Sequence, residues 1–156
     1  MAVEVVNESG VEVDEHALLE LAHAVMDGLH VHPAAELSVL CVDEAAMEQL
    51  HLDWMDLPGP TDVMSFPMDE LRPGTAAAPT EGLLGDVVIC PQVARVQAER
   101  GGHSTQDEMQ LLLTHGILHL LGFDHEDQAE RQEMFELQDR LLSEHLGRPA
   151  PRPTMD

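Results

Sequence analysis

The feature that most constrains this chain is an apolar helix that carries two histidines and ends shortly before a third. From Met109 to Leu121 apolar residues occur on nearly all sides, which predicts a helix enclosed by the rest of the fold. His115 and His119 stand four residues apart, so their rings leave the same face of that helix. The fold has to be built around this element, because an apolar helix is stable in water only when other layers cover it.

The third histidine, His125, can join the other two only if the helix ends in between. On a continuous helix it would lie about 9 Å further along the axis and roughly 240° around it from His119. Gly122 stands where the helix has to stop, since glycine adopts without steric cost the left-handed conformation that ends helices. Three neutral imidazoles on one divalent ion leave a position for water, as in catalytic zinc sites. We therefore expect one zinc ion at His115, His119 and His125.

Two alternatives to a zinc site stay open. Nickel, copper and iron also bind imidazole, so an all-nitrogen set favours zinc without excluding them. A single histidine on an apolar helix is more often a core residue than a ligand, and the chain has ten histidines. The spacing and the glycine break set these three apart.

The remaining segments predict a fold of the α+β class. Short runs of β-forming residues predict four strands, over about 2–6, 36–42, 61–67 and 82–90. Helical periodicity with capping residues predicts five helices, over about 15–29, 44–52, 91–101, 105–121 and 127–145. We expect a single domain, residues 1–146, in which a small mixed sheet of about four strands packs with helices around the histidine-bearing helix. The Pro-rich residues 147–156 predict a disordered tail.

Cysteines and hydropathy predict a cytoplasmic protein. Cys41 and Cys90 each end an apolar run without a second cysteine nearby, which predicts buried free thiols. No apolar run approaches the roughly 18 to 20 residues of a membrane span, and the first residues lack the basic and long apolar segments of a signal peptide. We expect no membrane partner.

The charge of the chain argues against tight binding to naked RNA. Thirty acidic residues face seven basic ones, all arginine, for a formal net charge of -23. Nucleic-acid binders normally carry a basic face, because phosphate contacts supply much of their affinity. A local site is still compatible with this charge, since Arg95 and Arg100 fall in one predicted helix and a bound divalent cation adds positive charge of its own.

The histidine spacing is also that of metzincin proteases, but one residue separates the two cases. Those enzymes carry a glutamate directly after the first histidine as general base, and this chain has Gly116 there. A metal that lowers the pKa of its own water and polarises a phosphoryl oxygen has less need of a side-chain base. Cleavage of a phosphodiester therefore fits these residues better than cleavage of a peptide.

Three blocks of the chain, taken together, carry a family resemblance. They are His115-Gly-Ile-Leu-His119-Leu-Leu-Gly-Phe-Asp-His125, Pro60-Thr-Asp-Val-Met-Ser-Phe-Pro67 and Leu84-Gly-Asp-Val-Val-Ile-Cys-Pro91. In this order and spacing, over about residues 35–135, they resemble the YbeY family, the bacterial rRNA maturation endoribonucleases.

The resemblance implies a single α+β domain with a three-histidine zinc site at His115, His119 and His125. It implies single-strand-specific RNA cleavage in 3′-end maturation of small-subunit (16S) rRNA and in ribosome quality control. The implied partners are the rRNA precursor, small-subunit ribosomal proteins and the GTPase Era. The alternative is a ribosome-assembly factor whose metal is chiefly structural, and a metzincin-like peptidase is a distant third.

The chain departs from the family pattern next to its single tryptophan. The family often has a basic residue where Met55 follows Trp54, so a phosphate contact made there is missing or comes from another arginine. With the acidity of the chain, this predicts a substrate presented by a ribosomal particle. Asp62, Ser65 and Asp86 in the family blocks are equally compatible with a structural role and with substrate contact, and Asp124 with shaping a turn. No residue is assigned as general base.

Overall fold

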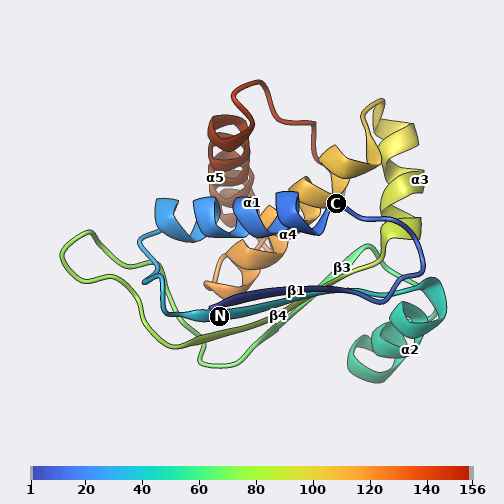
Figure 1. The fold of residues 1–156 in the computed structure, drawn as a ribbon, viewed down its shortest axis with the longest axis horizontal. Helices are drawn as coiled ribbons and strands as arrows, with labels where there is room; N and C mark the ends of the chain where they lie inside the picture. The colour runs from blue at the N-terminus through green and yellow to red at the C-terminus, as the bar shows by residue number, and fades with distance from the viewer. Residues whose placement is uncertain (1, 155–156) are drawn as a thin grey trace.

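Four strands form one mixed sheet in a computed structural model of the protein, which describes residues 2–154 (Figure 1). They are β1 (Val3–Asn7), β2 (Glu36–Cys41), β3 (Val63–Pro67) and β4 (Leu83–Ile89). Their order across the sheet is β1-β2-β4-β3, in which β1, β2 and β4 are parallel and β3 is antiparallel to β4. Strand β3 therefore lies at an edge of the sheet.

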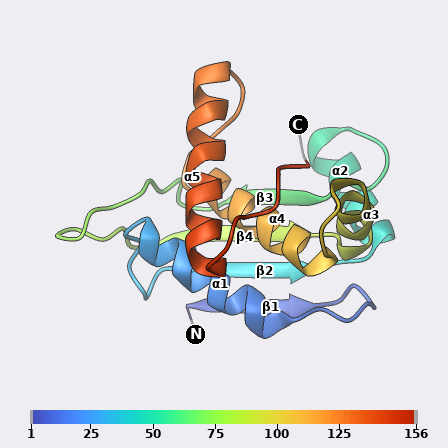
Figure 2. The same cartoon turned by 90° about the horizontal axis from the view of Figure 1, so that it is seen from above.

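Five helices cover the sheet unequally. They are α1 (Glu15–Gly28), α2 (Glu44–Met55), α3 (Pro91–Gly101), α4 (Thr105–Leu120) and α5 (Gln128–Leu146). Helices α1, α4 and α5 lie over one face, and α2 lies on the opposite side near one end of the strands (Figures 1 and 2). This arrangement confirms the predicted single α+β domain with a four-stranded mixed sheet.

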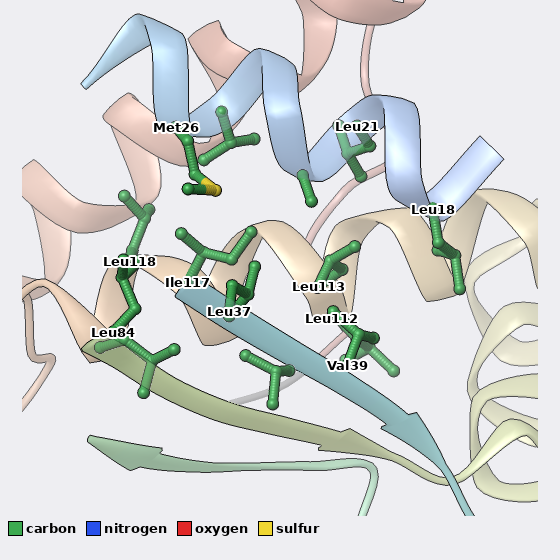
Figure 3. Packing of buried hydrophobic residues seen from close by; sticks show 14 of the residues in the cluster. Leu18, Leu21, Met26, Leu37, Val39, Leu84, Leu112, Leu113, Ile117 and Leu118 are labelled. Carbon is green, nitrogen blue, oxygen red and sulfur yellow. The ribbon is translucent and has the colours of Figure 1, made fainter. Parts of the chain in front are cut away.

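Helix α4 lies at the centre of the larger apolar cluster, as its sequence predicts. Ser104 caps its start, because the serine hydroxyl accepts a hydrogen bond of 3.0 Å from the N–H of Asp107. Figure 3 shows its apolar side chains between α1 and the sheet. The cluster includes Leu18, Leu21 and Met26 of α1, Leu112, Leu113, Ile117 and Leu118 of α4, and Leu37, Val39 and Leu84 of the strands.

The last three residues of strand β4 are buried on both faces, as their apolar run predicts. Val87 and Ile89 belong to the cluster that includes α4, whereas Val88 belongs to a second cluster with Met47 of α2. Cys41 and Cys90 are free and buried, which confirms the prediction for the two thiols.

Helix α2 extends further than the sequence predicts, to Met55 instead of about residue 52. It ends at Asp56, which has a left-handed backbone (φ 56) and donates its N–H to the carbonyl of Leu52 at 3.0 Å. Trp54 therefore lies in the last turn of a helix and not in the following loop.

The described part of the tail, 147–154, has no helix or strand but contacts the body of the protein. Arg148 donates hydrogen bonds of 3.0 and 2.8 Å to the two carboxylate oxygens of Asp107 at the start of α4. The hydroxyl of Thr154 donates a hydrogen bond to buried Glu108. The disorder expected from residue 147 stays a prediction, and residues 155–156 lie outside the described part.

None of the helices between residues 2 and 154 combines the length and the apolar character that crossing a bilayer requires.

Candidate metal centre

The end of α4 turns the chain back toward its own last turn. The N–H of Gly122 donates to the carbonyl of His119 at 3.1 Å, and the N–H of Phe123 donates to that of Leu118 at 3.0 Å. Gly122 has the left-handed backbone (φ 91) that this pair of hydrogen bonds requires. The expected glycine stop is therefore present, and it allows His125 to return to the helix.

The three histidines lie together as the spacing predicts. One ring nitrogen from each of His115, His119 and His125 can be chosen so that all three lie within 4.8 Å of one another. The Nε2 atoms of His115 and His119 are 3.0 Å apart. Two imidazole nitrogens on a tetrahedral zinc ion at 2.0–2.1 Å would be about 3.3 Å apart, so this pair fits an ion with little movement.

Burial keeps the two helical imidazoles neutral. Burial, followed by the neighbouring His119, lowers the pKa of His115 to about 4. The pKa of His119 is also lowered, first by burial and then by the charge of His125. Both rings therefore present lone pairs at neutral pH, which is the form that binds a metal ion.

Helix α5 fixes the orientation of His115. The Nδ1 of this ring lies 2.8 Å from the buried side-chain oxygen of Gln138, which makes Nδ1 the donor and leaves Nε2 toward the other histidines. Phe135 stacks on the same ring at 5.7 Å between centroids. Sequence reasoning missed Gln138, although a polar residue on the inward stripe between Met134 and Leu142 was a usable signal.

The histidines open onto a polar cavity of about 500 Å³. Its lining includes Arg100 from the last turn of α3 and Thr154 from the tail. Arg95, the other arginine of that helix, lines a different cavity, and its Nε lies 3.6 Å from Glu99. Of these two arginines, Arg100 is therefore the one that supplies positive charge beside the histidines.

The polar residues of the two other sequence blocks divide between this cavity and the opposite face of the sheet. Ser65 lines the cavity and donates a hydrogen bond of 2.9 Å to the carbonyl of Gly116, which ties β3 to α4. Asp62 also lines it and accepts from the N–H of Val63 at 2.7 Å. Asp86 is exposed and lines a separate pocket with Ser38.

The sequence left open whether Asp62, Ser65 and Asp86 have a structural role or contact substrate, and their hydrogen bonds and positions bear on this choice. Ser65 and Asp62 both have structural hydrogen bonds in the cavity wall. Asp86 is on the strand position before Val87, so its side chain leaves the sheet on the face away from α4. Asp124 accepts from the N–H of His125 at 2.7 Å, which is a turn-shaping contact.

Comparison with known proteins connects this site to one family. A sequence model of the family described as endoribonuclease YbeY matches residues 4–146. Over 156 residues the chain is 67% identical to a protein named endoribonuclease YbeY from Micrococcus luteus, covering 100% of this chain and 99% of that one. A protein of the same name from Paenarthrobacter aurescens is 62% identical, with 99% of each chain covered.

A solved structure shows the same fold. The solution structure of TM1509 from Thermotoga maritima superposes with a TM-score of 0.65 at 24% identity, covering 93% of this chain and 89% of that one.

Proposed function

The chain belongs to the YbeY family, and from this premise we propose that it is a zinc-dependent endoribonuclease that cleaves single-stranded RNA. The observation that carries the proposal is the convergence of three ring nitrogens at the wall of an open polar cavity. The names of the relatives supply the substrate class, and the site chemistry agrees with it.

His115, His119 and His125 would hold the ion through their ring nitrogens. A bound divalent ion supplies a Lewis acid for a phosphoryl oxygen and lowers the pKa of water, which together suit phosphodiester hydrolysis. Gln138 keeps His115 in the required orientation, and Ser65 holds α4 against β3. Arg100, on the same cavity, stabilises the negative charge of a phosphate that enters it.

The local packing argues against a peptidase. A Cβ on Gly116 would lie 2.7 Å from Cγ1 of Val87, so no side chain fits where metzincins carry their glutamate. The position faces the side chains of Val87 and Ser65, which belong to the sheet. A general base at this place is excluded by space as well as by residue type.

The finer parts of the proposal come from the resemblance. We propose that the protein acts in the cytoplasm on the 3′ end of small-subunit (16S) rRNA and in ribosome quality control. Small-subunit proteins and the GTPase Era are its proposed partners. The acidic chain supports a substrate presented by a particle, since basic ribosomal proteins attract an acidic surface.

The decisive experiment replaces one histidine and follows metal and RNA separately. His119→Ala is expected to lose the bound zinc, measured as moles of metal per mole of protein, and to leave unprocessed 3′ ends of small-subunit rRNA in cells. His23→Ala, which removes an exposed histidine of α1, is the matched control and should change neither. If His119→Ala is folded and metal-free yet 3′ ends mature normally, the protein is an assembly factor and not the nuclease.

A further inference from the structure

A second cavity, of about 520 Å³, adjoins the histidine cavity along the edge of the sheet. Both cavities are lined by Thr61, Val63, Ser65, His119 and His125. The second one extends past these residues to Trp54 and Met55 of α2 and to Phe66 of β3. The two cavities therefore form one continuous groove.

The groove passes around β3, which has a hydrogen-bonded neighbour on one side only. Ser65 contacts α4, on the face that carries the histidines. Phe66 packs with the second apolar cluster, which includes Met47 of α2 and lies on the other face. An extended chain that follows this groove would cross from the metal centre to the end of α2.

An exposed aromatic pair lies at the α2 end of the groove. Trp54 is 67% exposed, which is unusual for the largest apolar residue of a chain with an apolar core. Its ring meets that of Phe66 edge to face, with 5.5 Å between centroids and 71° between planes. Phe66 is half-buried and packs against the indole ring, part of whose surface stays exposed to solvent.

The charge of the protein favours an uncharged contact with RNA. With a net charge of -23, the molecule repels a polyanion at long range, and within residues 2–154 the pocket that contains Trp54 is lined by no arginine or lysine. Stacking of a base on an aromatic ring needs no positive charge and accepts any base. It also requires an unpaired base with a free face.

Resting on the nuclease function proposed above, we propose that Trp54, supported by Phe66, is the platform on which one unpaired base of the RNA stacks while the neighbouring backbone lies at the histidines. The platform selects single-stranded substrate, because the faces of bases in a duplex are covered by their neighbours. Trp54 is thus a specificity-determining residue of the same site.

The sequence provides its own probe for this contact. Trp54 is the single tryptophan and the chain has no tyrosine, so intrinsic fluorescence reports this ring alone. Titration of the zinc-loaded protein at low salt with a short single-stranded DNA, which resists cleavage by a ribonuclease, is expected to quench the emission. The same sugar-phosphate strand without bases is the control and should leave the emission unchanged.

Substitutions of Trp54 test whether the stacking contact contributes to the binding of RNA substrate. Trp54→Ala is expected to raise KM for single-stranded RNA about ten-fold with little change in kcat, and Trp54→Phe to raise it less, since phenylalanine still stacks. Leu52→Ala, an exposed apolar residue of the same helix outside the groove, should match the wild type.

The two readouts separate failure of this inference from failure of the nuclease function. Cleavage by the wild type without quenching, and with an unchanged KM in Trp54→Ala, overturns the platform alone. Quenching by the base-containing strand without cleavage of any RNA overturns the nuclease function and supports the platform. Equal quenching by the strand without bases overturns the platform, because the contact would then be to the backbone.

Discussion

At the scale of single residues, Gly116 accounts for the close approach of the histidine-bearing helix to the sheet. It follows His115 directly, and an added Cβ would lie 2.7 Å from Cγ1 of Val87 and 3.2 Å from Oγ of Ser65. Its backbone carbonyl also accepts a hydrogen bond of 2.9 Å from the Ser65 hydroxyl. The residue that distinguishes this chain from metzincins is therefore explained by packing.

Gly116→Ala is expected to lower the free energy of unfolding by about 1–3 kcal/mol, because the methyl group overpacks the contact with the sheet. The gain in helix propensity, at most about 1 kcal/mol, does not offset this. Urea denaturation measures the change. Gly28→Ala is the matched control. Its Cβ would contact only the movable end of the Leu141 side chain, so this substitution should lower the free energy of unfolding less. Equal effects of both substitutions would contradict the packing argument.

The two buried thiols should make the protein less stable at alkaline pH, in a range where no lysine or tyrosine titrates. Burial raises the pKa of Cys41 from 9.0 to about 12, and burial also raises the pKa of Cys90. Between these values the folded protein binds more protons than the unfolded chain, so stability falls as pH rises above 9. The chain has neither lysine nor tyrosine to titrate in the same range.

The midpoint of urea denaturation under reducing conditions should therefore fall steadily from pH 9 upward. Cys41→Ala should make this decline shallower, although it lowers stability at neutral pH by removing a buried side chain. A midpoint that does not change with pH above 9 would show that the thiols titrate alike in both states. A thiol reagent should react with buried Cys41 only after the protein unfolds.

At the scale of elements, the sequence predicts most of what local chemistry determines. Ser104 caps α4 and Gly122 ends it, because both act within a few residues of their own position. The end of α2 was misplaced, since Asp56 had to adopt a left-handed backbone that favours glycine over most residues. A local pattern cannot reveal this when an aspartate takes the place of the glycine.

Contacts between distant segments were the part that sequence reasoning could not supply. The orientation of His115 depends on Gln138, which lies 23 positions after it. The groove depends on Trp54 of α2 lying beside Phe66 of β3. The first pairing follows from the packing of α5 against α4, and the second from a sheet order that puts β3 at the edge next to β4. A single sequence determines neither.

The tail gives a prediction at this scale, because its contacts disagree with its composition. Arg148→Ala is expected to loosen residues 148–151, since the two hydrogen bonds to Asp107 are lost, whereas Thr154 keeps its hydrogen bond to Glu108. NMR order parameters of these residues should then fall below about 0.6. Overall stability should change little, because the Arg148 side chain is 51% exposed and exposed ion pairs contribute little to stability.

Arg152→Ala removes the same charge from the same segment and is the control for this experiment. It should leave the order parameters of residues 148–151 unchanged. Values already below about 0.6 in the wild type would mean that the tail is disordered, as its proline content predicts.

At the scale of the whole molecule, the charge determines how RNA can reach the site. Acidic residues outnumber arginines thirty to seven, so naked RNA is repelled outside a local region around Arg100 and the histidines. Few phosphates are neutralised on binding, and few counterions are released. Affinity for naked single-stranded RNA should therefore be weak at physiological salt and should depend little on salt.

Lowering the salt concentration from about 200 to about 50 mM is expected to change this affinity less than about three-fold, because the gain from roughly one neutralised phosphate is opposed by less screened repulsion from the acidic surface. Arg100→Ala should remove most of the gain from the neutralised phosphate. Trp54→Ala should lower the affinity at every salt concentration and leave the salt dependence unchanged, because stacking releases no counterions. Anisotropy of labelled RNA measures each slope.

Precursor small subunits, whose basic proteins attract an acidic enzyme, should be processed faster than the same rRNA stripped of protein. Tight binding to naked RNA with a steep salt dependence would contradict this account, since it would require a basic surface that seven arginines, dispersed over an acidic chain, do not provide.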